Sequence, residues 1–237
     1  AGIAISDGST KGIAPKAKIV SVKACNTLGQ CYASDVLAGI EYCTTNKAVY
    51  DIKVLLGSIG DGGAYDKSNC PTYFDSALSN ASKANITSVF AAGNDGALGV
   101  NYPACSPHSI ATGSSTKQDT IASFTNRGER LDVLAPGENV ISPNKQGSYS
   151  SLNGTSASAP MVAGAILLLK QANNSLTFEN VKYLLNQTDK YLSGYPRLNI
   201  QKALDNIGNL PAPTNETSNI TNETTPEVNI TGTGITL

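Results

Sequence analysis

A serine at the start of a hydrophobic stretch is the first residue whose position suggests chemistry. Residues 153–164 read NGTSASAPMVAG, so a Gly-Thr turn places Ser156 at the beginning of a predicted helix whose residues Val162–Leu169 are apolar on every side. The first N–H groups of a helix lack intrahelical acceptors and favour negative charge, which suits a hydroxyl whose attack on a carbonyl creates an oxyanion. Pro160 is expected in the first turn, where a missing N–H is tolerated. Gly-Thr-Ser is also a common helix cap, so this segment alone does not define a nucleophile.

A second polar group follows a predicted strand. The segment AAGNDG (91–96) ends that strand in a Gly-rich turn, which presents Asn94 at the carboxyl edge of a sheet, where ligands gather in open α/β folds. Asn-Asp-Gly on its own is only a turn signal. Together with the N–H of Ser156, however, the Asn94 carboxamide would form a two-donor oxyanion hole. The pair therefore points to acyl transfer.

Short apolar runs alternate with helical stretches along the chain. Strands are predicted over residues 17–22, 52–58, 87–94, 109–113 and 131–134. Helices are predicted over 34–43, with Ser34 as N-cap and Val36, Leu37 and Ile40 on one face, and over 73–84, 156–171, 177–187 and 200–207. This rhythm predicts an α/β fold with a doubly wound, mostly parallel sheet and helices on both faces.

Composition excludes several classes of partner. The 237 residues hold 17 Lys and Arg against 18 Asp and Glu, so no basic excess favours nucleic acid. The longest apolar stretch, 157–169, is interrupted and shorter than the roughly 20 residues that a membrane span needs. We expect a monomer with no membrane span.

Five cysteines occur without a C-x-x-C pair and with a single histidine, which argues against zinc. Cys25 and Cys31 flank a short turn and can form a disulfide; Cys70 with Cys105 is a second candidate pair. The alternative is that some are buried free thiols.

Composition changes after Leu210 to a segment rich in Thr and Asn. We expect residues 209–237 to be a disordered linker or stalk, because they hold too little apolar surface to fold. Four N-x-Ser/Thr sequons suit an extracellular, glycosylated segment, although a polar tail can match so loose a motif: Asn215, Asn219, Asn222 and Asn229. These features predict a secreted or cell-surface glycoprotein.

Seven motifs over residues 1–208 give the chain a family resemblance. They are GIAPKAKIVSVKA (12–24), AGIEY (38–42), GSIG (57–60), AAGN (91–94), IASFTNRG (121–128), LDVLAPG (131–137) and NGTSASAPMVAG (153–164). In this order they resemble the subtilisin family of serine endopeptidases. The resemblance implies Ser156 as nucleophile, Asn94 as oxyanion donor and an extended peptide substrate held by strand addition. The substrate-binding residues that it implies are Ser58, Ile59 and Gly60 on one side, Gly29 to Cys31 on the other, and Ala91, Ala92 and Gly93 in a pocket.

Departures from the family pattern concern the rest of the catalytic machinery. In the family an Asp and a His precede the Ser, and the His opens a His-Gly-Thr-His-Val-Ala-Gly motif, of which Ala1-Gly2 resemble the last two residues. We therefore expect a partial peptidase domain (1–208) that begins just after the catalytic His. His108 falls at the wrong place in the order to be the base. The loop 6–12, where many relatives bind calcium, is short and contains Lys11, so no metal or other cofactor is expected.

Three other classes of protein compete with this interpretation. An inactive subtilisin-like binding module would explain the missing base but not the intact Ser156, Asn94 and substrate segments. An α/β-hydrolase esterase needs a G-x-S-x-G pentapeptide, which the sequence lacks. A glycan-decorated structural domain is supported only by the tail.

Overall fold

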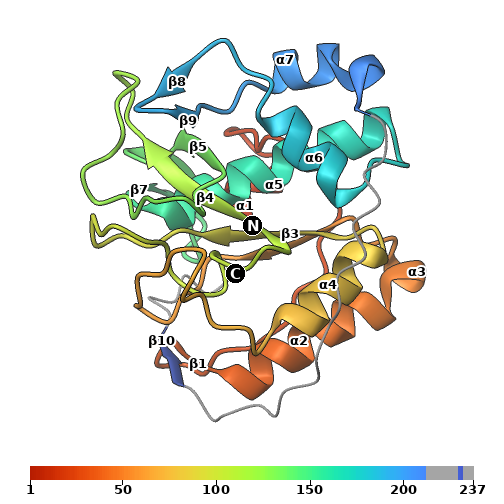
Figure 1. Ribbon diagram of the computed structural model, residues 1–237, viewed down its shortest axis with the longest axis vertical. Coiled ribbons are helices and arrows are strands. Elements are labelled where there is room, and N and C mark those ends of the chain that lie inside the picture. Colours follow the sequence, from red (N-terminus) through yellow and green to blue (C-terminus); the bar gives the residue numbers. More distant parts are fainter. Residues whose placement is uncertain (212–228, 232–237) are drawn as a thin grey trace.

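The computed structural model of the protein describes residues 1–211 and 229–231 (Figure 1). Its centre is a four-stranded parallel sheet in the order β2-β3-β4-β5. The strands are β2 (Val54–Gly57), β3 (Thr87–Ala91), β4 (Ser109–Ser115) and β5 (Val133–Pro136). Because all four run in one direction, their carboxyl ends share one edge of the sheet, and the predicted α/β fold with a parallel sheet is confirmed.

Helices cover both faces of this sheet. Because side chains alternate along a strand, successive residues of the buried strands pack against opposite helix layers. Val89 and Ala91 of β3 pack in the cluster formed with α5 (Thr155–Ala172) and α6 (Phe178–Leu185). Phe90 points to the opposite cluster, formed with α2 (Ala33–Thr45) and α4 (Asp75–Lys83). Figure 1 shows α2 and α4 below the sheet and α5, α6 and α7 (Ile200–Asp205) above it.

Helix α5 runs through the core antiparallel to the strands. Its first turn lies at the carboxyl edge, where the Gly154 N–H donates to the Gly137 carbonyl at 2.9 Å just after β5. At its other end the buried Lys170 ammonium donates to the backbone oxygens of Asn85 (2.9 Å), just before β3, and Leu176 (3.2 Å). These contacts fix both ends of the helix that carries Ser156.

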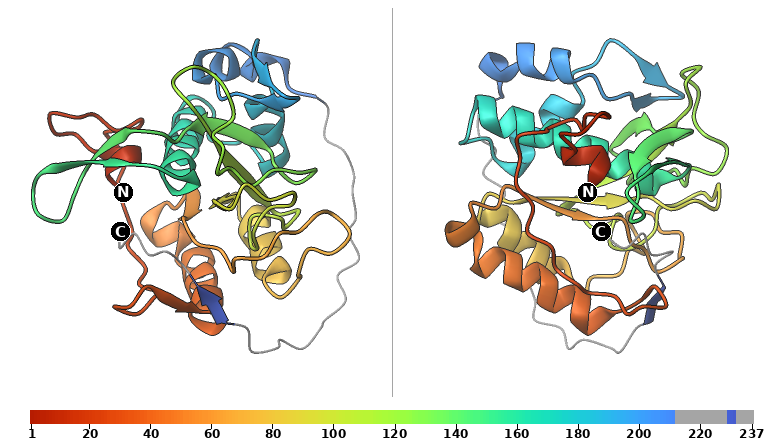
Figure 2. Two further views of the ribbon diagram at one scale, coloured as in Figure 1. Left: turned by 90° about the vertical axis from the view of Figure 1, so that its left-hand side faces the viewer. Right: turned by 180° about the vertical axis from the view of Figure 1, so that it is seen from behind.

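The predicted strand over 17–22 is wrong. These residues run from α1 (Gly2–Ile5) toward β1 (Gln30–Tyr32) as a segment that pairs with no strand of the described residues (Figure 2). Ile19 is 51% and Val22 39% exposed, because the segment passes outside the layers instead of entering the sheet beside β2. The apolar run resembled a buried strand in composition, but a strand also needs a hydrogen-bonding neighbour.

The helix starts also depart in detail from the sequence prediction. Helix α2 begins at Ala33, and its N-cap is Tyr32 without a side-chain cap, so the prediction of Ser34 as N-cap is wrong. Ser34 is the second residue of the helix and therefore lies past the N-cap position. Val36 and Ile40 are buried as predicted.

Smaller elements complete the described chain. They are α3 (Lys47–Tyr50), the hairpins β6 (Val140–Pro143) with β7 (Tyr149–Leu152) and β8 (Tyr191–Leu192) with β9 (Tyr195–Pro196), a 3-10 turn (Ile207–Asn209), and β10 (Asn229–Thr231), which pairs antiparallel with β1. Most of the predicted linker 209–237 lies outside the described residues and stays a prediction. Among the helices that are described, none has the length and apolarity to cross a membrane.

Both predicted cysteine pairs are confirmed. Cys25 is bonded to Cys31, and Cys70 to Cys105. Cys43 is a free, half-buried cysteine, and burial raises the pKa of its thiol.

Candidate active site

Ser156 is the second residue of α5, at the carboxyl edge of the sheet. Gly154 is the N-cap, with φ at +138°, a conformation that favours glycine. Between residues 154 and 160 every residue except Ser156 is buried, and Ser156 is half-buried. The fold therefore exposes this one side chain at a helix N-terminus, where negative charge is favoured.

Asn94 lies beside this helix start, although 62 positions separate it from Ser156 in the sequence. Its Oδ1 accepts hydrogen bonds from the Thr155 N–H (2.8 Å) and the Thr155 hydroxyl (2.9 Å). Because the oxygen is held in this way, the exposed Nδ2 group is the part of the carboxamide that is left to donate to a ligand. A Cβ on Gly154 would lie 3.4 Å from that Nδ2, so Asn94 closely lines the turn before the serine. The structure brings together the two residues that the sequence paired.

Two buried asparagines that the sequence analysis missed hold the Asn94 turn. Asn126 Oδ1 accepts from the N–H groups of Asp95 (2.8 Å) and Ala97 (3.1 Å). Asn101 packs against Gly93, where a Cβ would come within 2.8 Å of its carboxamide. Gly93 also has φ at +111°, so the position requires glycine. Asn126 lies in the motif IASFTNRG, which could have been used to predict it, whereas no sequence pattern marks Asn101.

The segment after β2 contacts the backbone of Ser156. The Ser58 hydroxyl donates to the Ser156 carbonyl oxygen at 3.2 Å. Gly60 lies so close to Asn101 that a Cβ there would be 2.5 Å from its Oδ1. Asp61 then accepts hydrogen bonds from the Gly63 N–H (2.9 Å) and the Tyr65 hydroxyl (2.7 Å), and burial together with this carboxylate raises the pKa of Tyr65 to about 12. These contacts fix the predicted substrate segment Ser58–Gly60 as a loop beside Ser156.

The other predicted substrate residues differ in what they leave available. Gly29 (φ +80°) ends the turn 26–29 that precedes β1, and an extended strand, Asn229–Thr231, pairs antiparallel with β1. Ala91 and Ala92 are buried in opposite core clusters, so their backbone rather than their methyl groups is left to line a pocket. Their binding roles stay predictions.

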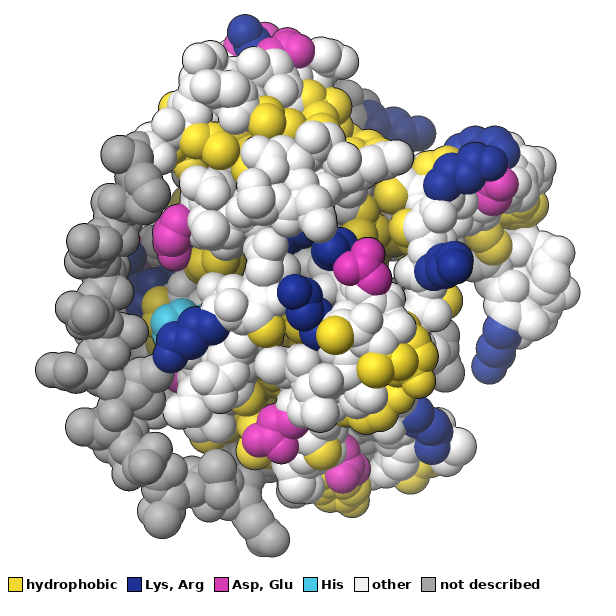
Figure 3. Space-filling view, turned by 90° about the vertical axis from the view of Figure 1, so that its right-hand side faces the viewer, with side chains coloured by type: hydrophobic (Ala, Val, Ile, Leu, Met, Phe, Trp, Pro, Cys, Tyr) yellow, Lys and Arg dark blue, Asp and Glu magenta, His cyan; other side chains and the backbone are white. Residues whose placement is uncertain are grey.

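His108 lies at the opposite edge of the sheet from Ser156. It immediately precedes β4, whereas the start of α5 adjoins the carboxyl end of β4 through Gly137, whose N–H donates to Ser115 at 3.0 Å. Seven residues of strand separate the two ends, roughly 20 Å at the rise of a β-strand. His108, cyan in Figure 3, is half-buried, and burial lowers the pKa of its imidazole. It is not placed to act on Ser156.

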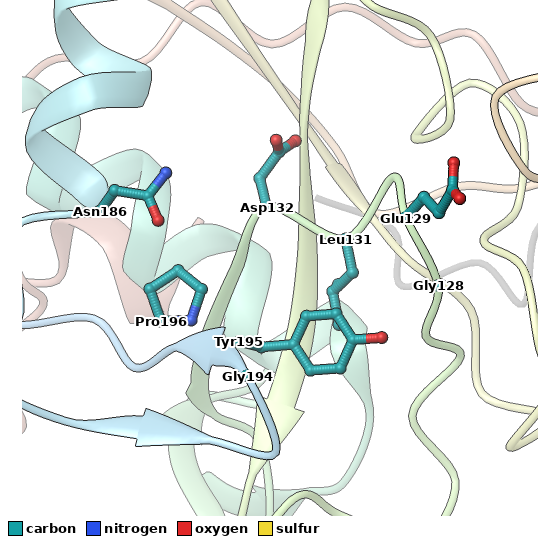
Figure 4. A pocket seen from close by; sticks show the side chains of 8 residues that line it. All are labelled: Gly128, Glu129, Leu131, Asp132, Asn186, Gly194, Tyr195 and Pro196. Carbon is teal, nitrogen blue, oxygen red and sulfur yellow. The ribbon is translucent and has the colours of Figure 1, made fainter.

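A polar pocket of about 590 Å³ lies away from this site (Figure 4). It is lined by Gly128, Glu129, Leu131, Asp132, Asn186, Gly194, Tyr195 and Pro196. Asp132 immediately precedes β5 and is already paired with Lys182 (2.9 Å) and the Ala111 N–H (2.8 Å). Because neither Ser156 nor Asn94 lines the pocket, we do not assign it to the candidate active site.

The loop 6–12, where no calcium is expected, contains a single carboxylate. Its carboxylate, Asp7, pairs with the Lys11 ammonium within the same loop, which supplies a cation of its own. The Lys11–Asp7 pair also holds the pKa of that carboxyl below its usual value. Over the residues that the structure describes, no group of three or more His, Cys, Asp or Glu side chains is arranged to hold a metal.

A serine at a helix N-terminus beside a carboxamide, at the carboxyl edge of a parallel sheet, is the arrangement that an acyl-transfer site requires. Residues 1–221 match the Subtilase family, Peptidase_S8, and the chain belongs to this family. The resemblance given by the seven motifs is thereby confirmed, and family membership supports a serine endopeptidase function in general terms.

Individual relatives agree with this assignment. Subtilisin BL of Lederbergia lenta is 33% identical over 190 residues, which cover 77% of this chain and 67% of that protein. Subtilisin E of Bacillus subtilis strain 168 is 34% identical, and the match covers 81% of this chain but only 50% of that protein.

Solved structures show the same fold. A protease from Pseudoalteromonas arctica superimposes with a TM-score of 0.77 at 25% identity, over 86% of this chain and 68% of that one. A cold adapted subtilisin-like serine proteinase gives a TM-score of 0.71 at 30% identity, over 82% of this chain and 72% of that one.

Proposed function

We propose that this protein is a serine endopeptidase that cleaves peptide bonds through an acyl-enzyme on Ser156. The hydroxyl oxygen attacks the scissile carbonyl carbon, its proton passes through a general base to the leaving amine as the C–N bond breaks, and water then hydrolyses the ester. The Ser156 N–H and the Asn94 Nδ2 donate to the oxyanion that forms on the carbonyl oxygen. The observation that carries this proposal is the Thr155 contact that orients the Asn94 carboxamide beside Ser156.

We further propose that the general base and its orienting carboxylate are supplied from outside these 237 residues. The chain contains one histidine, and it lies at the far end of β4 from Ser156. A nucleophilic serine needs a base within hydrogen-bonding distance. An inactive binding module is the second candidate function, and the same lack of a base favours it.

The substrate in this proposal is an extended segment of protein or peptide. Its backbone would pair with Ser58, Ile59 and Gly60 on one side and with Gly29 to Cys31 on the other, with Ala91 to Gly93 around the residue before the scissile bond. The pairing of β1 with β10 supports strand addition as the binding mode, because it places an extended strand opposite Gln30 and Cys31.

A secreted or cell-surface location completes the proposal. The two disulfides support it, because they suit an oxidising compartment. Of the four predicted glycosylation sites, Asn229 begins β10, whereas Asn215, Asn219 and Asn222 lie outside the described residues. A monomer without cofactor or nucleic-acid partner remains our expectation.

Substitution of Asn94 in the full-length gene product tests the oxyanion hole. We expect Asn94→Ala to lower kcat by about a hundred-fold to a thousand-fold with little change in KM, because the donor meets charge that exists only in the transition state. Asn94→Asp is the sharper variant, since its carboxylate keeps both acceptor contacts with Thr155 but loses the NH2 donor. Hydrolysis of a chromogenic peptide anilide measures both constants. An Asp variant with normal kcat, or a loss confined to KM, would reject the donor role.

A further inference from the structure

Pro160 leaves a gap in the hydrogen bonding of α5 at the proposed nucleophile. The expectation that it falls in the first turn is wrong, because the helix begins at Thr155 and Pro160 is its sixth residue. In a regular helix the N–H of residue 160 donates to the carbonyl of residue 156. Proline has no N–H, so the Ser156 carbonyl lacks its helical donor.

Ser58 fills this gap from the neighbouring strand end. Its hydroxyl donates to the Ser156 carbonyl oxygen at 3.2 Å, across 98 positions of sequence and in a partly buried setting. A carbonyl left without a donor in such a setting is costly. The contact therefore couples the end of β2 to the backbone of the residue that carries the nucleophilic hydroxyl.

We infer that Ser58 is a positioning residue for catalysis, whose side chain replaces the missing Pro160 amide and fixes the backbone of Ser156. This inference rests on the proposed function. The Ser156 backbone carries both the attacking hydroxyl and one of the two oxyanion donors, so a small shift of this carbonyl misplaces both groups at once. Substrate pairing uses the backbone of Ser58, which a side-chain substitution leaves in place. The hydroxyl should therefore affect kcat rather than KM.

Two substitutions at Ser58 in the full-length gene product give the first test. We expect Ser58→Ala to lower kcat about tenfold at unchanged KM, after correction for the fraction of active enzyme by active-site titration. Ser58→Thr keeps the hydroxyl and should retain kcat within about threefold. Equal losses in both variants, or a loss found only in KM, would overturn the inference.

A double-mutant cycle with Pro160 gives the decisive test. Pro160→Ala restores an N–H that can donate to the Ser156 carbonyl, so Ser58→Ala should cost less than about twofold in kcat in that background. A tenfold loss in both backgrounds would overturn the inference. The same cycle can be measured through the melting temperature, which does not require peptidase activity. Ser58→Ala should lower the melting temperature in the native background but not in the Pro160→Ala background. A protein without peptidase activity would thus refute the proposed function, while an additive melting cycle would refute the role of Ser58.

Discussion

Replacement of Ser156 by alanine in the full-length gene product is expected to abolish peptide hydrolysis, with kcat lowered about a million-fold. This is the size of the loss measured when the nucleophile is removed from a subtilisin, so we take the magnitude from that relative. The reason is chemical, because no acyl-enzyme can form without the hydroxyl. Hydrolysis of fluorescently labelled casein measures the effect.

The matched control is Ser151→Ala, which removes an exposed serine of β7. It should leave hydrolysis within about twofold, as is usual for surface substitutions. Both variants should bind a noncovalent peptide inhibitor equally well, because such binding uses backbone groups and needs no bond to the Ser156 hydroxyl. If Ser156→Ala retained more than about a hundredth of the native kcat, another residue would have to be the nucleophile.

The 237 residues on their own are expected to show essentially no peptidase activity. Within them, the histidine lies roughly 20 Å from the start of α5, too far to take the proton from Ser156. Loss of the base costs about as much as loss of the nucleophile in a subtilisin. The oxyanion donors would remain, so the defect lies in proton transfer rather than in the fold.

Reaction with a fluorophosphonate measures this second prediction, because the reagent requires an activated serine. The isolated chain should label no faster than its Ser156→Ala variant, with circular dichroism as the check that both are folded. Rapid labelling of Ser156 in the isolated chain would contradict the account and would demand another base close to α5.

Local sequence patterns predicted the positions of Ser156 and Asn94 better than they predicted the whole sheet. Ser156 and Asn94 each follow a glycine-containing turn at an element boundary, so their residue types and motifs placed both at the same sheet edge. The run at 17–22 has the composition of a strand, but its pairing depends on a neighbour that composition does not specify. Ile19 and Val22 are exposed for this reason.

The contacts that support the site were harder to predict. Asn101 acts through its packing against Gly93 and Gly60, which only the folded chain brings together. The role of Ser58 likewise depends on the register between the end of β2 and α5. Each of these polar side chains contacts the backbone of a segment that is distant in the sequence, Gly60 for Asn101 and Ser156 for Ser58, and no local period or motif encodes such a contact.

The most direct test of the central claim is to identify the residue that a fluorophosphonate modifies in the full-length gene product. Peptide mapping by mass spectrometry should find a single adduct, on Ser156, and loss of peptidase activity should follow the extent of labelling. Asn94→Asp should label more slowly at the same position, because the phosphonyl oxygen uses the same donors. An active enzyme that carried its adduct on another residue, or none after full exposure, would contradict the assignment of Ser156 as the nucleophile.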